Sequence, residues 1–145
     1  METKFRCHCP FTSALDILGD KWILVIIKQM LLEGKQTFKD FTESDEAIAT
    51  NILSTKLKQL EAFGMVLKTK LPNNKKSNIY LLTEKGLALT PLIMELGIWS
   101  DTYLRDVHPG IVEGKGMELL RSDKDAFGSA IIKKYREKLA DHQSS

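Results

Sequence analysis

Hydrophobic residues recur at spacings of three and four over much of the N-terminal half, which is the pattern of amphipathic helices. Residues Lys21–Leu32 are apolar around most of the helical circumference, so this helix is expected at the centre of the domain, with Asp20 as its N-cap. A shorter helix is predicted over Thr12–Leu18. Another is predicted over Phe38–Thr42, capped by Thr37, with both phenylalanines pointing inward.

The helical period returns between Ala49 and Phe63, where Gly64 provides a C-cap. Five apolar residues share one face of this segment: Ile52, Leu53, Leu57, Leu60 and Phe63. A polar turn, Ser44-Asp45-Glu46, separates it from the preceding short helix. Two helices joined by a tight polar turn predict a helix-turn-helix, with the second helix as the recognition helix.

The period then changes to that of strands over Met65–Leu71 and Ser77–Leu82. The intervening Pro72-Asn73-Asn74 is a strong turn signal, so the two strands form a β-hairpin. A long helix is predicted from Glu84, capped by Thr83, to about Arg105, with a kink or break at Pro91.

An amphipathic helix is predicted near the C-terminus, after a glycine-containing linker. We divide the chain into a domain with flanking dimerisation helices (residues 1–106), a linker (107–123) and a C-terminal helix (124–145) packed on a dimer. The fold class is mainly α with a small β-hairpin, namely a winged helix-turn-helix with extra dimerisation helices.

Charge is distributed unevenly, although the formal net charge is only +2. Between Ala49 and Tyr80 six lysines stand against one glutamate, whereas the rest of the chain has 15 basic and 18 acidic residues. A local basic excess is typical of a nucleic-acid face, and it is equally compatible with a solvated lysine face.

The polar face of the recognition helix predicts contacts with double-stranded DNA. Thr50, Asn51 and Thr55 are the candidates for base contact, Asn51 by paired hydrogen bonds to an adenine, and Ala49 by its methyl group. Ser54, Lys56 and Lys58 are expected to bind phosphates. Thr50 and Asn51 could instead be capping groups.

The hairpin predicts a basic wing. Lys68 and Lys70 lie two residues apart on a strand and therefore share a face. Asn73, Asn74, Lys75 and Lys76 surround the tip, which is suited to a minor groove or the adjoining backbone. The two asparagines could also simply supply turn geometry.

Several separated motifs, in this order, closely resemble those of HxlR-type helix-turn-helix regulators, which are related to MarR-type proteins. The motifs are Cys9-Pro10, Ala14-Leu15-Asp16-Ile17-Leu18-Gly19-Asp20-Lys21-Trp22, Phe38-Lys39-Asp40-Phe41, Ile48-Ala49-Thr50-Asn51-Ile52-Leu53-Ser54, Lys56-Leu57-Lys58-Gln59-Leu60-Glu61, Gly64 and Tyr80-Leu81-Leu82-Thr83-Glu84-Lys85-Gly86. The resemblance covers residues 9–99. It implies a homodimeric transcriptional regulator on a pseudo-palindromic operator, with the N-terminal segment and the helix after the wing building the dimer.

This chain departs from the resemblance in places. Many members have arginine where Lys56 stands and near Lys75-Lys76, and the segment after Trp99 is longer than typical. Lysine keeps a phosphate contact but loses the two-pronged geometry of a guanidinium.

The two cysteines, Cys7 and Cys9, lie too close together to brace a fold and lack the second ligand pair of a zinc site. The resemblance implies a redox switch at Cys9 through an intersubunit disulfide or an adduct with an electrophile. Arg6 and His8 would lower its pKa. The alternative is a small buried apolar residue at the dimer interface.

The sequence argues against most functions other than DNA binding. The chain has no glycine-rich phosphate loop and no nucleophile elbow, so we expect no enzyme activity and no cofactor or metal. A winged helix that contacts only proteins stays open as an alternative. Aromatic and methionine side chains could line a small-molecule effector pocket or be packed core: Phe11, Trp22, Met94, Trp99 and Tyr103. Without an apolar leader or span, we expect a cytoplasmic protein with no membrane partner.

Overall fold

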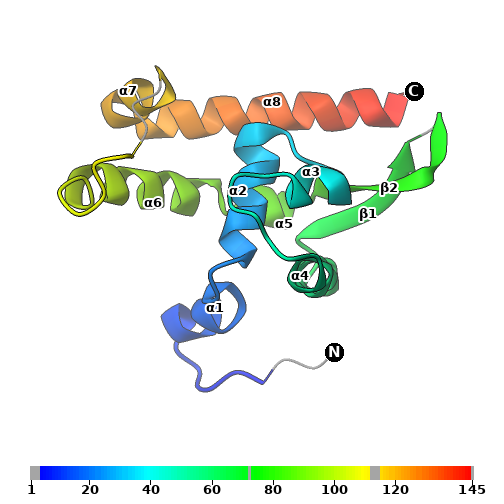
Figure 1. Ribbon diagram of the computed structural model, residues 1–145, viewed down its shortest axis with the longest axis horizontal. Coiled ribbons are helices and arrows are strands. Elements are labelled where there is room, and N and C mark those ends of the chain that lie inside the picture. Colours follow the sequence, from blue (N-terminus) through cyan, green and yellow to red (C-terminus); the bar gives the residue numbers. More distant parts are fainter. Residues whose placement is uncertain (1–3, 72, 112–114, 145) are drawn as a thin grey trace. The chain divides into compact units, whose positions relative to one another are not determined.

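The computed structural model describes residues 4–71, 73–111 and 115–144 and is mainly helical with one two-stranded sheet (Figure 1). The elements are α1 (Pro10–Leu18), α2 (Ile23–Glu33), α3 (Phe38–Thr42), α4 (Thr50–Ala62), β1 (Val66–Leu71), β2 (Asn74–Leu82), α5 (Glu84–Leu87), α6 (Thr90–Tyr103), α7 (Lys115–Ser122) and α8 (Lys124–Ser144). The chain divides into a winged unit, residues 1–86, and a C-terminal unit, residues 87–145. The predicted fold class is confirmed.

Helix α2 supplies the centre of the winged unit, as its all-round apolar sequence predicted. Its side chains Ile23, Ile26, Ile27 and Met30 are completely buried. Helices α3 and α4 and the hairpin complete this core with Phe41, Leu53, Leu57, Leu60, Ile79 and Leu82, each at most 2% exposed. Burial of such side chains contributes about 1.5–3 kcal/mol each.

The predicted helix cap Thr37 is confirmed, whereas α2 begins at Ile23, two residues later than predicted, with Trp22 rather than Asp20 as its N-cap residue. The Asp20 carboxylate accepts hydrogen bonds from the backbone N–H groups of Trp22 (2.7 Å) and Ile23 (3.0 Å) at the start of α2. Thr37 forms a reciprocal capping box with Asp40 at α3. The inward placement of Phe38 is wrong, because this side chain is 37% exposed and Phe41 alone fills the core from α3.

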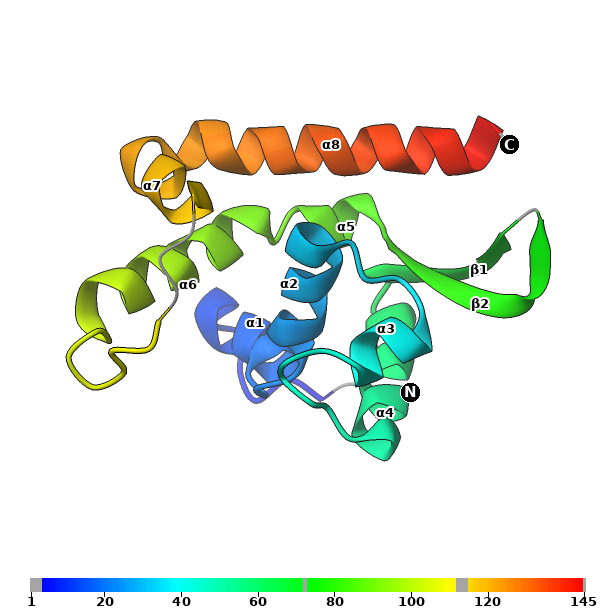
Figure 2. The ribbon, with the colours of Figure 1, turned by 45° about the horizontal axis from the view of Figure 1, so that its top comes forward.

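The hairpin is antiparallel, with Lys68 opposite Tyr80 and Lys70 opposite Asn78 (Figure 2). The register shifts between Lys70 and Leu71, because Leu71 pairs with Asn74 and leaves extra residues on β2. This β-bulge twists the ribbon toward its tip. The second strand therefore begins earlier than the sequence predicted.

The end of α4 is fastened to both ends of the hairpin. Gly64, at φ +75°, reverses the chain after the helix, a conformation that favours glycine. The Thr83 hydroxyl donates to the Gly64 carbonyl (2.6 Å), and the Lys85 ammonium donates to the Phe63 carbonyl (2.7 Å). Gly86 is so close to this junction that a Cβ there would lie 2.4 Å from the Met65 carbonyl oxygen. The recognition helix and the wing are thus joined through hydrogen bonds at one junction.

In the C-terminal unit, the predicted break at Pro91 is confirmed, because α5 ends at Leu87 and α6 begins at Thr90. Helix α8 packs against α6 where Gly128 faces Met94, at 3.7 Å from the position of a Cβ. A similar approach brings Leu120 of α7 toward Gly97 of α6. Helix α7 was not predicted and lies within the residues assigned to the linker.

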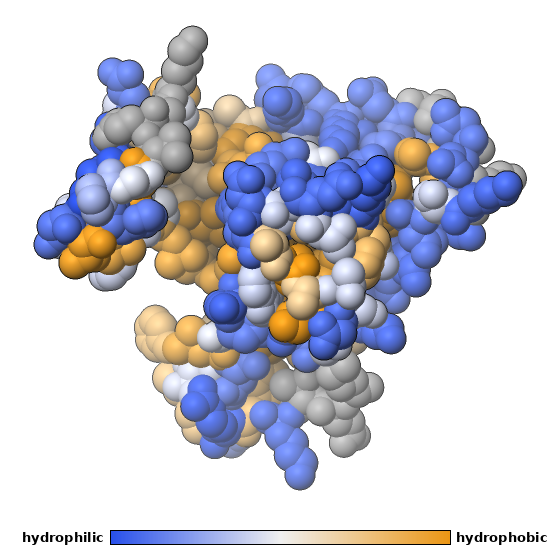
Figure 3. Space-filling view, viewed as in Figure 1, coloured by the Kyte–Doolittle hydropathy of each residue, from blue (hydrophilic) through white to orange (hydrophobic). Residues whose placement is uncertain are grey.

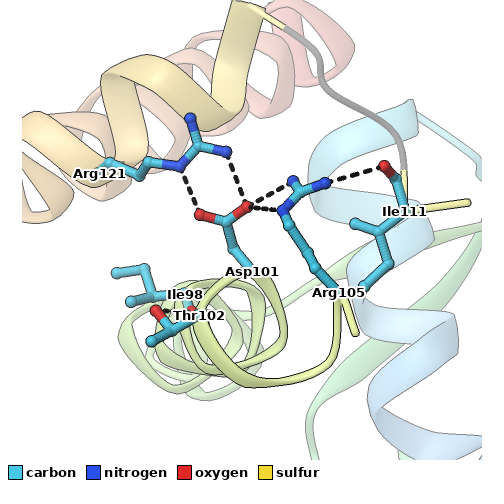
Figure 4. Close-up of polar contacts among 6 residues, drawn as sticks. All are labelled: Ile98, Asp101, Thr102, Arg105, Ile111 and Arg121. Carbon is cyan, nitrogen blue, oxygen red and sulfur yellow. Dashed lines mark hydrogen bonds and ion pairs between the residues drawn. The ribbon is translucent and has the colours of Figure 1, made fainter. Parts of the chain in front are cut away.

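A charged cluster fastens α7 to the end of α6 (Figure 4). Asp101 accepts hydrogen bonds from Arg121 (2.7 Å to Nη2) and Arg105 (2.8 Å to Nε), and Arg105 also donates to the Ile111 carbonyl (3.2 Å). The hydrogen bonds from Arg121 and Arg105 hold the pKa of the Asp101 carboxyl well below its usual range. A second ion pair joins Lys124 of α8 to Glu95 of α6.

Within the described ranges, no helix is long and apolar enough to cross a membrane. Nor do His, Cys, Asp and Glu side chains of this part of the chain gather in a group of three that could hold a metal ion.

Candidate nucleic-acid interface

Helix α4 has one buried face and one free face, as a recognition helix requires. Leu53, Leu57 and Leu60 are buried in the winged unit. The opposite face exposes Thr50, Asn51, Thr55 and Lys58, whereas Ser54 is half-buried. The Thr55 hydroxyl donates back to the Asn51 carbonyl (3.0 Å), which leaves its oxygen as an acceptor. The predicted base-contact residues therefore lie together on the first two turns.

The N-cap of α4 is the exposed Ala49, whose side chain has no hydrogen-bonding group. Thr50 and Asn51 are the first two residues of the helix proper, so the alternative that they cap it is wrong. The first backbone N–H groups of a helix have no partner within it and lie at the positive end of its dipole. This end of α4 is therefore suited to contact an anionic backbone.

Lys56 differs from the other predicted phosphate ligands because the structure already gives it a partner. Its ammonium lies 2.9 Å from the Asp20 carboxylate and 3.4 Å from the Gln59 amide oxygen. The side chain is only 19% exposed, whereas Lys58, two residues on, is exposed. Burial raises the pKa of the Asp20 carboxyl, but the hydrogen bonds from Lys56, Ile23 and Trp22 outweigh it and lower the pKa overall.

The wing presents Lys68, Lys70 and Lys76 at its surface, all exposed. Lys68 and Lys70 share one face of β1, as predicted. The Asn74 side chain accepts a hydrogen bond from the Lys76 backbone N–H (3.3 Å), so it supports the turn geometry that was one of its two predicted roles. The side chain of Lys75 and the whole of Pro72 lie outside the described residues.

Cys9 is half-buried at the N-terminus of α1, and its neighbour Cys7 is exposed. The backbone N–H and the hydroxyl of Thr12 and the backbone N–H of Phe11 lower the pKa of the Cys9 thiol. The prediction that Arg6 and His8 lower this pKa is wrong, because neither is among the groups that shift it, and the Arg6 guanidinium is hydrogen-bonded to Asp16 (2.6 Å). The helix N-terminus therefore favours the thiolate at this position.

The sequence analysis missed a set of polar contacts between α2 and the residues that precede α4. Gln29 of α2 is completely buried and donates hydrogen bonds to Ser44 (2.9 Å) and Glu46 (2.6 Å). The signal was present as one glutamine within the apolar stretch of α2. Its partners lie 15 and 17 residues away, so only the fold reveals them.

A recognition helix with a buried apolar back, joined at its end to a basic hairpin, defines a winged helix-turn-helix DNA-binding protein. The sequence model of the HxlR-like helix-turn-helix family matches residues 17–108, which is more than half of the chain. The chain belongs to this family and is a DNA-binding transcriptional regulator. Helices α7 and α8 lie beyond the matched residues.

Three relatives illustrate this membership. The HTH-type transcriptional regulator YodB of Bacillus subtilis (strain 168) is 38% identical over 96 residues, which cover 66% of this chain and 85% of YodB. The structure of reduced YodB matches this chain with a TM-score of 0.56 at 37% sequence identity. The match covers 67% of this chain and 95% of the YodB chain. The crystal structure of PA1607, described as a transcription factor, matches this chain with a TM-score of 0.62 at 32% sequence identity. The match covers 68% of this chain and 67% of the PA1607 chain.

The redox regulator HypR in its reduced form has a TM-score of 0.59 at 29% identity, over 70% of this chain and 99% of HypR. HypR has also been determined in its oxidised form. YodB has been determined after diamide treatment and with quinone bound.

Proposed function

We propose that the protein binds an operator as a homodimer, with the first two turns of α4 in the major groove and the wing on the adjoining backbone. In this arrangement Ala49, Thr50, Asn51 and Thr55 contact bases. Lys58, Lys68, Lys70 and Lys76 contact phosphates, together with Ser54, Asn74 and Lys75. The observation that carries the proposal is the exposed polar face of α4, directly opposite side chains that are fully buried.

Selection of bound fragments from the source genome by the purified protein tests this proposal and supplies the operator. Affinity is expected to fall steeply with salt, by about 0.9 log units per log unit of salt for each phosphate contact. Footprinting should show two protected half-sites one helical turn, or a multiple of it, apart. Binding that ignores both sequence and salt would favour the protein-only alternative.

Replacement of Lys75 and Lys76 by alanine separates phosphate contact from base contact. We expect weaker binding to all sequences alike and a flatter salt dependence. A changed sequence preference with an unchanged salt dependence would show that the wing, rather than α4, contacts bases.

Support for a dimer comes from an exposed apolar stripe on α6. Leu92, Leu96, Trp99 and Tyr103 are 40–65% exposed, and their spacing places them on one face of the helix. Figure 3 shows hydrophobic side chains gathered over α6 on the face in view. Met94, Gly97 and Asp101, which lie outside the stripe, contribute to the contacts of α6 with α7 and α8, and the stripe residues stay at least 40% exposed beside these helices. The extension therefore leaves this stripe free for a second copy of the chain.

The double variant Leu92→Glu, Leu96→Glu tests the dimer. Sedimentation should show a monomer, and operator affinity should fall far more than affinity for a single half-site. The matched control is Leu119→Glu on α7, an exposed leucine outside the stripe. A dimeric double variant would place the interface elsewhere.

A redox or electrophile input at Cys9 is supported by the lowered pKa of its thiol. The chain has only two cysteines, both near the N-terminus, so a disulfide within a homodimer must join N-terminal segments. Diamide would take two electrons and two protons from two thiols as the disulfide forms. Operator binding of wild type, Cys9→Ser and Cys7→Ser with and without diamide tests this input. Equal, oxidant-insensitive binding by wild type would rule it out.

A further inference from the structure

Gln29 places an amide group in the middle of the winged core. Its side chain is completely buried, as are those of Ile26 and Met30 of the same helix. Both amide protons are used, since Nε2 donates to Ser44 Oγ and to Glu46 Oε2. The amide oxygen is buried and has no hydrogen-bond partner among the described residues. An unsatisfied buried acceptor is destabilising, so the two hydrogen bonds that Nε2 donates must account for an amide at this position.

The amide holds the turn that leads into the recognition helix. Ser44 donates its own proton to the Phe41 carbonyl (2.7 Å), and Glu46 also pairs with Lys28 of α2. The next residue, Ala47, has φ +53°, in the left-handed region that alanine rarely occupies. Ile48 is then buried, and α4 begins two residues later. Two residues of the turn, Ser44 and Glu46, are thus fastened to α2 directly before the strained residue.

Helix α2 also contacts α4 at a second point. Asp20 caps α2 with one carboxylate oxygen and accepts from Lys56 of α4 with the other (2.9 Å). The recognition helix is therefore fixed at two places. The turn before its first residue is bound to Gln29, and Lys56, in its second turn, is bound to Asp20. Both attachments are made through polar groups of fixed direction, which resist sliding and rotation more than apolar contacts do.

We propose that Gln29 and Glu46 are positioning residues that fix the recognition helix for base discrimination, with α2 as its support. The inference rests on the proposed role of α4 in the major groove. Base hydrogen bonds depend on alignment to within about 0.5 Å. Flexible lysines follow the phosphates through larger displacements. Loss of the anchor should therefore impair discrimination between sequences and leave non-specific binding intact.

The experiment compares wild type with Gln29→Met, which keeps the side-chain length and removes the amide. Affinities are measured for the selected operator fragment and for a fragment with the same bases shuffled, at several salt concentrations. We expect operator affinity to fall about tenfold, with unchanged affinity for the shuffled fragment and an unchanged salt dependence. Urea unfolding should show that the variant stays folded under the binding conditions, because loss of the unsatisfied acceptor partly offsets loss of the two hydrogen bonds.

Gln36→Met is the matched control, because Gln36 also buries an amide oxygen without a partner among the described residues. Gln36 precedes α3, and its hydrogen bonds within the described part of the chain go to Tyr80 and Asp40 rather than to the turn before α4. This variant should keep full discrimination. An equal loss in both variants would mean that any change in the core disturbs binding, and it would overturn the proposal.

A second pair of variants decides the matter if Gln29→Met does not fold. Glu46→Gln keeps an acceptor for the Gln29 amide and should retain most of the discrimination, whereas Glu46→Ala should lose it. Undiminished discrimination in Gln29→Met or Glu46→Ala would overturn the inference. Failure of wild type to bind DNA in a salt-dependent manner would instead refute the proposed function itself.

Discussion

Different interactions stabilise the interior of the winged unit and the interior of the C-terminal unit. The winged unit buries an almost continuous apolar core and adds polar contacts at chosen points, such as Gln29 with Glu46. The C-terminal unit buries fewer large side chains, among them Ile93, Met94 and Leu120, and brings its helices together over glycines. Ion pairs at its surface then complete the contacts. The winged unit, which we propose contacts DNA, is thus the more sterically constrained of the two.

The largest expected effect tests this difference in packing. Gly86→Ala should lower the free energy of unfolding by about 3 kcal/mol, because its Cβ would meet the Met65 backbone and the Leu82 side chain. The matched variant in the other unit is Gly97→Ala, where the nearest atom, on Leu120, is 3.5 Å away. Gly97→Ala should raise the free energy of unfolding by about 0.5–1 kcal/mol, because alanine has a higher helix propensity than glycine. Urea unfolding measures both, and equal effects would remove the distinction between the units.

Two lysines of α4 separate side chains that contact DNA from side chains that position the recognition helix. Lys58→Ala should weaken DNA binding about tenfold and reduce the salt dependence by about 0.9 log units, as expected for one lost phosphate contact. Lys56→Ala should leave the salt dependence unchanged and impair discrimination, because its partner is Asp20. Fragment binding across a salt series measures both. If both variants lower the salt dependence equally, Lys56 leaves Asp20 and binds phosphate in the complex.

The charged cluster of the C-terminal unit should make that unit sensitive to acid. Arg121 and Arg105 lower the pKa of Asp101 in the folded state, so the cluster stabilises the fold above the ordinary carboxyl value, 3.8. This stabilisation is lost as the pH falls below that value. Asp101→Asn should therefore have a lower melting temperature than wild type at pH 7. This difference in melting temperature should shrink as the pH falls toward 2.

Thermal melting followed by circular dichroism checks the acid sensitivity. Asp106→Asn is the control, because Asp106 accepts a hydrogen bond from its neighbour Val107 and is exposed. If the difference in melting temperature between wild type and Asp101→Asn stays constant with pH, the ion pairs contribute little to stability.

The smallest expected effect concerns the strained turn before α4. Ala47→Gly should raise the free energy of unfolding by about 0.5 kcal/mol. It relieves about 1–2 kcal/mol of left-handed strain and costs about 0.4–1 kcal/mol through a more flexible unfolded chain. Ala62→Gly, in the last turn of α4, should instead destabilise the protein by about 0.5–1 kcal/mol. Urea unfolding compares them, and destabilisation by both would show that Ala47 is not strained.

Local patterns predicted most of the fold. The apolar spacing located α2 and α4, Pro91 located the break before α6, and Thr37 was correctly assigned as a cap. Helix α7 was missed because Gly114 and Gly116 indicated a linker, while its stabilising contact, Arg121 with Asp101, spans 20 residues. Phe38 was misplaced because its spacing from Phe41 puts both on one helix face, whereas tertiary packing covers only Phe41 and leaves Phe38, the first residue of α3, 37% exposed.

The candidate site was predictable only in part. The exposed residues of α4 and the wing follow from helical and strand periodicity. The partner of Lys56 does not, because Asp20 lies 36 residues away and both residues have ordinary local explanations. The same holds for Gln29, whose surroundings are set by tertiary packing. Sequence periodicity therefore indicates which side chains face outward, and the fold decides which of them are already engaged.

The junction between the end of α4 and the two ends of the hairpin has a consequence for DNA topology. Since Gly64, Thr83 and Lys85 join these segments through hydrogen bonds, the helix and the base of the wing move together. The angular offset between major-groove and backbone contacts is then set by the protein. A duplex that is overwound or underwound changes this offset, so the regulator should respond to the superhelical state of its target.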